Sequence, residues 1–166
     1  MPVLSINSIP STLLSTLPLI SMTDVLGLGL FLGGFVFEVI ADNQKNAWVQ
    51  EKKRKEHDED FVTRGLWSKS RHPNYFGEST LWTGIAVTSA GVLVGNVGQE
   101  GMGLAGTSYG HLLGLALAVV SPAFATFLLL KVSGVSLIEE KYDRKYGHRK
   151  DYQEWKKSTP MYVPKF

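Results

Sequence analysis

Residues 71–78 place charged and polar side chains at the point where a charged segment becomes a long apolar one. Such side chains are costly at the edge of a membrane unless they have a function. Pro73 suits the first turn of a helix, and the amides that follow it could bind an anion together with Arg71. The alternative is an ordinary helix start whose charges extend into water. The candidate binding residues here are Arg71, His72, Asn74, Tyr75 and Glu78.

A second group of polar residues lies on the apolar segment before this run. Glu38, Asp42 and Lys45 or Asn46 recur at spacings of three and four residues, so a helix would carry them on one face. Polar side chains near the end of a membrane helix are expected to point inward. The alternative is a helix end exposed to water, where charge costs little.

A third candidate face follows the last apolar segment. Glu139 and Tyr146 lie seven residues apart, two helical turns along one face, from which they could reach residues 71–78. The alternative for both is an ordinary charged helix surface.

Four short motifs together resemble the C-terminal domain of the steroid 5-alpha-reductase superfamily. They are Gly65-Leu66-Trp67, residues 70–78, Lys131-Val132-Ser133-Gly134 and Lys145-Tyr146-Gly147. Within the superfamily, the chain is most similar to the DUF1295 branch of membrane proteins. The resemblance covers about residues 35–164 and is specific to the superfamily rather than to one reaction.

The resemblance implies an NADPH-dependent reductase of carbon–carbon double bonds in a lipid or steroid-like substrate. Arg71 would neutralise phosphate, and Trp67 or Tyr75 would pack against a ring. Hydrogen bonds to amide or ribose groups would come from Asp42, Asn74 and Glu78. His72, Glu139 and Tyr146 complete the expected cofactor-binding residues.

Two other functions stay open. Isoprenylcysteine and phospholipid methyltransferases share an Arg-His-Pro-x-Tyr-x-Gly stretch and a later Glu-Glu pair, which Glu139-Glu140 matches. This similarity implies S-adenosylmethionine as the alternative cofactor. A non-catalytic membrane protein is the second alternative.

The chain departs from the sterol reductases at two points. Leu137 and Glu140 stand where those reductases carry Arg and His, which weakens the case for phosphate binding. The substrate-polarising Glu and Tyr of the steroid 5-alpha-reductases lie in an earlier part that this chain lacks. We therefore expect a member shortened at its N-terminus, or one whose missing helices come from a partner membrane protein, and assign no catalytic residue.

The distribution of apolar and basic residues predicts an all-α integral membrane helix bundle. Apolar residues collect in three stretches, residues 25–41, 79–97 and 112–130, each long enough to cross a hydrocarbon core of about 30 Å. The alternative is that they are buried helices of a soluble core. We expect about three transmembrane helices, followed by interfacial C-terminal helices in which Tyr152 and Trp155 act as membrane anchors.

Orientation follows from the 17 Lys and Arg residues, which all fall within residues 45–71 and 131–165. Basic loops stay in the cytoplasm, so we expect a multi-pass protein with a cytoplasmic C-terminus, in a membrane such as the endoplasmic reticulum. Residues 1–24 form an N-terminal segment that is either disordered or interfacial. Residues 25–166 form the membrane domain.

Composition excludes several kinds of site. The chain has no cysteine, which rules out disulfides and thiolate chemistry. Its four histidines lack the spacing of metal ligands, and no dinucleotide or Walker glycine motif follows a predicted strand. We expect no metal site, no nucleic-acid partner, and contacts with membrane lipids.

Overall fold

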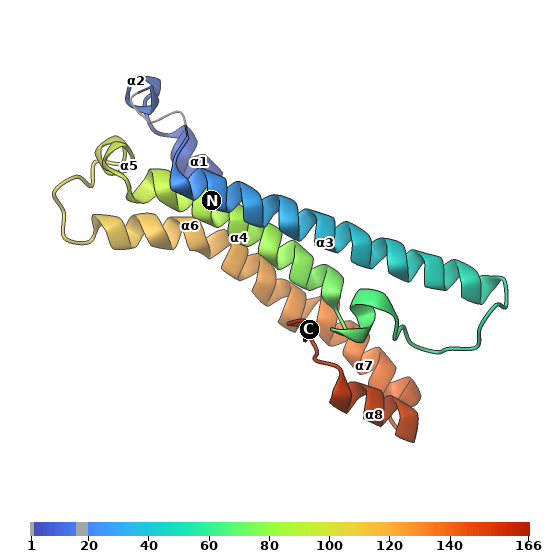
Figure 1. Cartoon of the computed structure of the whole chain (residues 1–166). Coiled ribbons are helices and arrows are strands. Elements are labelled where there is room, and N and C mark those ends of the chain that lie inside the picture. Colours follow the sequence, from blue (N-terminus) through green and yellow to red (C-terminus); the bar gives the residue numbers. More distant parts are fainter. Residues whose placement is uncertain (1, 16–19) are drawn as a thin grey trace. The chain divides into compact units, whose positions relative to one another are not determined.

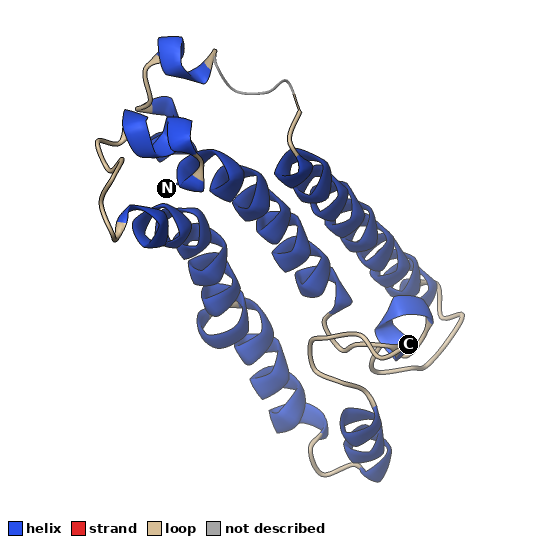
Figure 2. Ribbon diagram, turned by 60° about the vertical axis from the view of Figure 1, so that its left-hand side comes forward, coloured by secondary structure: helices blue, strands red, loops and turns tan. Residues whose placement is uncertain are grey.

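The structure, a computed structural model, describes residues 2–15 and 20–166, and every regular element within them is helical (Figures 1 and 2). The all-α prediction is therefore confirmed. The elements are α1 (Pro2–Asn7), α2 (Ser11–Leu14), α3 (Met22–Lys53), the 3-10 helix η1 (Gly65–Ser68), α4 (Pro73–Val94), α5 (Asn96–Gly101), α6 (Gly110–Phe127), the π-helical segment η2 (Leu128–Val132), α7 (Gly134–Tyr146) and α8 (Lys150–Ser158).

Helix α3 begins at a reciprocal cap. The backbone N–H of Ser21 donates to the Asp24 carboxylate at 2.9 Å, and the N–H of Asp24 donates to the Ser21 hydroxyl at 3.2 Å. These bonds satisfy amides that the first turn would leave without partners. Lys52 and Lys53 in the last turn complement the negative end of the helix dipole.

Two helical segments of the described chain are long and apolar enough to cross a membrane. They are α3 and the continuous segment Gly110–Tyr146, formed by α6, η2 and α7. Their large apolar side chains are exposed, as shown by Phe35 at 50%, Leu112 at 72% and Phe124 at 60%. A soluble core helix would bury such side chains, so their exposure indicates a membrane protein.

The second expected span corresponds to α4, which is not one of these two segments. This helix begins at Pro73 rather than near residue 79, and its first turns therefore include the polar residues Asn74 and Glu78. The count of three spans stays a prediction.

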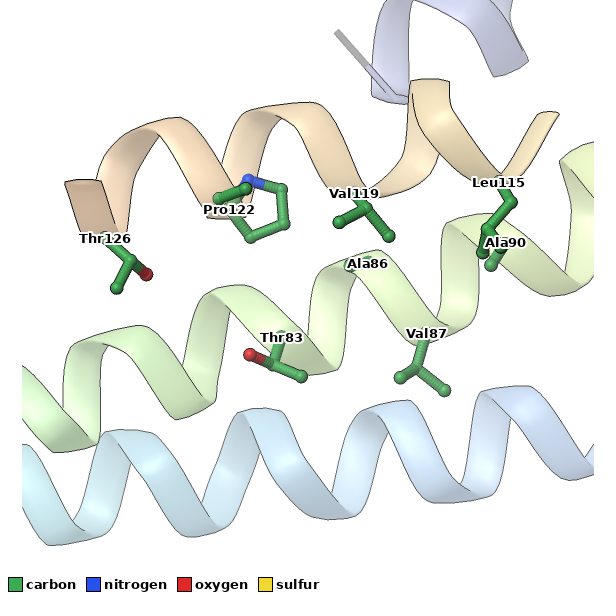
Figure 3. Close-up of a pocket in the computed structure, with 9 residues that line it drawn as sticks. Thr83, Ala86, Val87, Ala90, Leu115, Val119, Pro122 and Thr126 are labelled. Carbon is green, nitrogen blue, oxygen red and sulfur yellow. The ribbon is translucent and has the colours of Figure 1, made fainter. Parts of the chain in front are cut away.

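The described chain divides into two compact units, and the first comprises residues 1–32 and 80–126. Its buried core contains Ile9, Leu93 and Ala118. An apolar groove of about 380 Å³ is lined by α4 and α6, and Figure 3 shows Ala86 and Val119 on its two walls. Of the expected N-terminal segment, residues 1 and 16–19 lie outside the described residues. Its boundary at residue 24 stays a prediction.

The second unit comprises residues 33–79 and 127–166. One core cluster contains Trp48, Val62 and Trp67, and another contains Phe61, Tyr146 and Tyr152. Tyr152 is only 1% exposed. The expectation that it anchors the chain in the membrane interface is wrong, because its ring packs inside this unit.

Candidate functional site

The segment Gly65-Leu66-Trp67 is held against α3 by side-chain hydrogen bonds. The N–H of Leu66 donates to Oε1 of Gln44 at 2.8 Å, and Nε1 of Trp67 donates to the carbonyl of Ala41 at 2.8 Å. Gly65 adopts a φ of 57°, a conformation that favours glycine. These contacts place the buried Trp67 ring beside the turn that leads into α4.

That turn is fixed by the C-terminal tail. The N–H of Arg71 donates to the carbonyl of Pro160 at 2.8 Å, and the Ser70 hydroxyl donates to the carbonyl of Tyr162 at 2.8 Å. The N–H of His72 donates to the Ser70 hydroxyl at 3.1 Å. Arg71 and His72 are consequently buried, at 8% and 3% exposure.

The carboxylate of Glu139 on α7 contacts both of these basic side chains. Its Oε2 pairs with Nη1 of Arg71, and its Oε1 lies 2.9 Å from Nε2 of His72. Lys156 on α8 adds a third base, with its Nζ 3.4 Å from Oε2 of Glu139. A buried carboxylate is tolerated when it is paired and hydrogen-bonded in this way.

These residues line a cavity of about 20 Å³ in the second unit. Its walls include Lys45, Trp67, Arg71, His72, Glu139, Tyr142 and Trp155. Two buried N–H donors, Nε of Arg71 and Nε1 of Trp155, have no hydrogen-bond partner among the described residues. Buried donors of this kind are rare in folded proteins, and a ligand with several oxygen atoms could satisfy them.

Four of the sequence candidates do not line this cavity, namely Asp42, Asn74, Tyr75 and Glu78. The Tyr75 ring stacks on the His72 ring, with 5.9 Å between centroids and 16° between planes. It also lies against Gly134, where an added Cβ would come within 2.8 Å of the ring. Gly134 therefore leaves the space that Tyr75 occupies.

Tyr146 also lies away from the cavity. Its ring packs against Phe61 and Tyr152, and its hydroxyl donates to Asp60 at 3.4 Å. Asp60 in turn binds Arg149. These contacts place Tyr146 in an aromatic cluster that packs the loop before α4 against α7 and α8, where its side chain stabilises the fold.

Sequence reasoning missed three residues around the cavity. Trp155 and Tyr142 line it, and Lys156 reaches the Glu139 carboxylate. A signal was available in α8, where Tyr152 and Trp155 at a spacing of three could equally have predicted a face packed on protein. The sequence prediction assigns that face to the membrane interface instead.

Comparison with known protein families supports the family resemblance that the motifs in η1, at the Arg71 turn and around α7 carry. The family described as "Protein of unknown function (DUF1295)" matches residues 2–98 and 101–159. No curated protein and no solved structure matches the chain. Because the family match covers nearly the whole chain, the protein belongs to the DUF1295 family.

Proposed function

We propose that the protein binds NADPH at the cavity lined by Arg71, His72 and Glu139, here called the Arg71 cavity, and reduces a carbon–carbon double bond of a lipid or steroid-like substrate. The observation that carries this proposal is the surplus of buried N–H donors around Arg71. Arg71 and His72 contact the Glu139 carboxylate, Lys45 lines the same cavity, and Lys156 lies between Glu139 at 3.4 Å and Asp143 at 2.5 Å. An anionic ligand would supply acceptors for the donors that these carboxylates leave without a partner among the described residues.

The donor set fits a phosphate better than a carboxylate. Arg71 offers a planar fork of donors, which matches phosphate oxygens in two parallel hydrogen bonds. In the described part of the chain, its Nε is still without a partner while Glu139 is bound, as is Nε1 of Trp155. A terminal phosphate, with three oxygens, has more acceptor sites than one carboxylate.

The aromatic walls support a ligand that also carries flat rings. Trp67, Tyr142 and Trp155 line the cavity, and Nζ of Lys45 lies 4.9 Å from the centre of the Trp67 ring. Such surfaces suit an adenine or nicotinamide ring. Asp42, Asn74 and Glu78 would hold amide or ribose groups from α3 and α4.

NADPH, when bound, supplies a hydride, and the chain supplies position and charge. Arg71 and His72 would hold the phosphate, and the packing of Tyr75 against Gly134 would keep the His72 ring in place. We assign no residue as the proton donor.

The alternative is a methyltransferase that uses S-adenosylmethionine, and one observation favours it. Glu139 lies beside Arg71 and His72, so the three could bind the ammonium and carboxylate groups of that cofactor's amino-acid end. The other member of the pair, Glu140, is exposed and pairs with Arg144. Only one of the two matching glutamates therefore lines the cavity.

In the same proposal the chain crosses the membrane more than once. The basic segments, including the C-terminus, face the cytoplasm. Membrane lipids surround α3 and α6.

The test is a parallel titration of the purified, detergent-solubilised chain with NADPH and S-adenosylmethionine. Saturable binding of NADPH, with weak or absent binding of S-adenosylmethionine, supports the proposal. Tight binding of S-adenosylmethionine alone favours the methyltransferase. If the folded protein binds neither, the non-catalytic function is favoured and the Arg71 cavity is structural.

A further inference from the structure

The Glu139 carboxylate occupies the position that suits an anionic ligand. Both of its oxygens are used, one by Arg71 and one by His72, and Lys156 lies 3.4 Å away. The Glu139 side chain is 13% exposed, against 8% for Arg71 and 4% for His72. Arg71 and His72 thus converge on the Glu139 carboxylate of α7, and Lys156 is shared between Glu139 and Asp143.

The remaining space is too small for a ligand. A cavity of about 20 Å³ holds about one water molecule, so a phosphate group cannot enter while Glu139 stays in place. At the same time Nε of Arg71 and Nε1 of Trp155 are buried, and neither has a hydrogen-bond partner within residues 2–15 and 20–166. The carboxylate therefore fills the site without satisfying all of its donors.

We infer that Glu139 is a built-in competitor of the phosphate ligand. It pairs with Arg71 and His72 while the site is free of ligand, and a phosphate group displaces it on binding. Glu139 thus lowers the affinity of the site, while in the free protein it pairs with the buried Arg71 and His72 side chains. This inference rests on the proposed binding of a phosphate-bearing cofactor at Arg71.

If Glu139 competes with the ligand, removing its charge should raise the affinity for phosphate, whereas removing a ligand-binding residue would lower it. Replacing Glu139 by Gln keeps the size and one acceptor but removes the charge that Arg71 and His72 now share. Phosphate binding should then become tighter, because the ligand no longer has to break an ion pair. If Glu139 were itself a ligand-binding group, the same change would weaken binding.

The experiment titrates inorganic pyrophosphate and NADPH into the full chain in a phosphate-free maltoside detergent. We expect Glu139→Gln to bind pyrophosphate more tightly by about tenfold or more, the scale of one charge-assisted hydrogen bond. Glu139→Asp should fall between this variant and the wild type. The matched control is Glu140→Gln, which removes a neighbouring exposed glutamate and should leave the affinity unchanged.

Equal or weaker pyrophosphate binding in Glu139→Gln overturns the inference. If that variant is too unstable to titrate, the rise of its unfolding temperature with added pyrophosphate replaces the affinity. A larger rise than in wild type supports the inference, and an equal or smaller rise overturns it.

Two further arms separate this inference from the proposed function. Tighter pyrophosphate binding without any NADPH binding keeps the competitor role and rejects the reductase. NADPH binding that Glu139→Gln leaves unchanged rejects the competitor and keeps the reductase. If phosphatidic acid in mixed micelles, rather than pyrophosphate, shows the gain, the competitor role stands and the phosphate is that of a lipid headgroup.

Discussion

Arg71 is the residue at which the two candidate cofactors differ most. Its guanidinium is buried and lies 5.9 Å from the centre of the Trp155 ring, and its Nε has no hydrogen-bond partner among the residues that the structure describes. NADPH offers phosphate groups to such a fork, whereas S-adenosylmethionine offers one carboxylate and a sulfonium. A guanidinium pairs with either group, so the two cofactors differ at Arg71 in the number of acceptor oxygens that they offer it.

We expect Arg71→Lys to weaken NADPH binding by about 1 to 3 kcal/mol, because a lysine cannot form the two parallel hydrogen bonds of the guanidinium. Isothermal titration of the detergent-solubilised protein would measure this. Arg64→Lys is the matched control, since Arg64 is exposed and pairs only with Glu51 and Glu59 among the described residues. Equal losses in both variants would contradict the assignment.

Asp60 makes a pH-dependent contribution to stability. The hydrogen bond from Arg149, together with that from Lys52, holds the pKa of Asp60 below its ordinary value in the folded protein. A carboxylate with a lowered folded pKa stabilises the fold above its unfolded pKa of about 4, and this stability is lost as the pH falls.

The unfolding temperature of the wild type should therefore fall on acidification through and below pH about 4. Asp60→Asn should start from a lower unfolding temperature at neutral pH and show a shallower fall. Differential scanning fluorimetry in detergent across this pH range would measure both. Parallel curves for the two proteins would show that Asp60 does not contribute in this way.

At the scale of elements, α3 and α4 approach each other closely at Gly77. An added Cβ there would come within 2.7 Å of the Glu38 backbone nitrogen and 2.8 Å of the Gly34 carbonyl oxygen. Phe37 and Phe76 make an edge-to-face contact beside it, with 5.7 Å between centroids. Small residues permit this kind of close packing between membrane helices.

We expect Gly77→Ala to lower the free energy of unfolding by about 1 to 3 kcal/mol, because the methyl group would meet backbone atoms that cannot move independently. Gly33→Ala is the control on α3, since an added Cβ there meets nothing within 4 Å. Unfolding in mixed micelles with increasing SDS would measure both. A larger loss for Gly33→Ala than for Gly77→Ala would contradict this account of the contact.

At the scale of the whole molecule, the basic segments predict a topology with three membrane crossings. The chain contains no cysteine, so a single introduced cysteine would be the only thiol to react. Ser68, Ser108 and Ser158 are all exposed and are therefore suitable positions for these substitutions. With three crossings, only the cysteine at position 108 should react from the non-cytoplasmic side. Labelling of positions 108 and 158 from the same side would reject the three-span topology.

The sequence by itself determined the fold class, the membrane character and part of the candidate site. Helical periodicity and the length of an apolar run are local properties, which explains why α3 and α6 were predicted near their observed positions. The turn at Arg71 was recognisable because polar residues at a membrane edge are costly. The structure brings Trp67, Arg71, His72 and Glu139 together around one cavity, although their role in binding a cofactor stays a prediction.

Only the tertiary structure decided which side chains meet. It placed Glu139 on Arg71 and His72, turned Trp155 and Lys156 toward the same cavity, and put Tyr146 in a separate aromatic cluster. It also left Asp42, Tyr75 and Glu78 outside the lining of that cavity. Spacing along a helix shows which residues share a face, but not what that face packs against. What a helix face packs against depends on contacts between residues far apart in the sequence, such as His72 and Glu139 at a separation of 67.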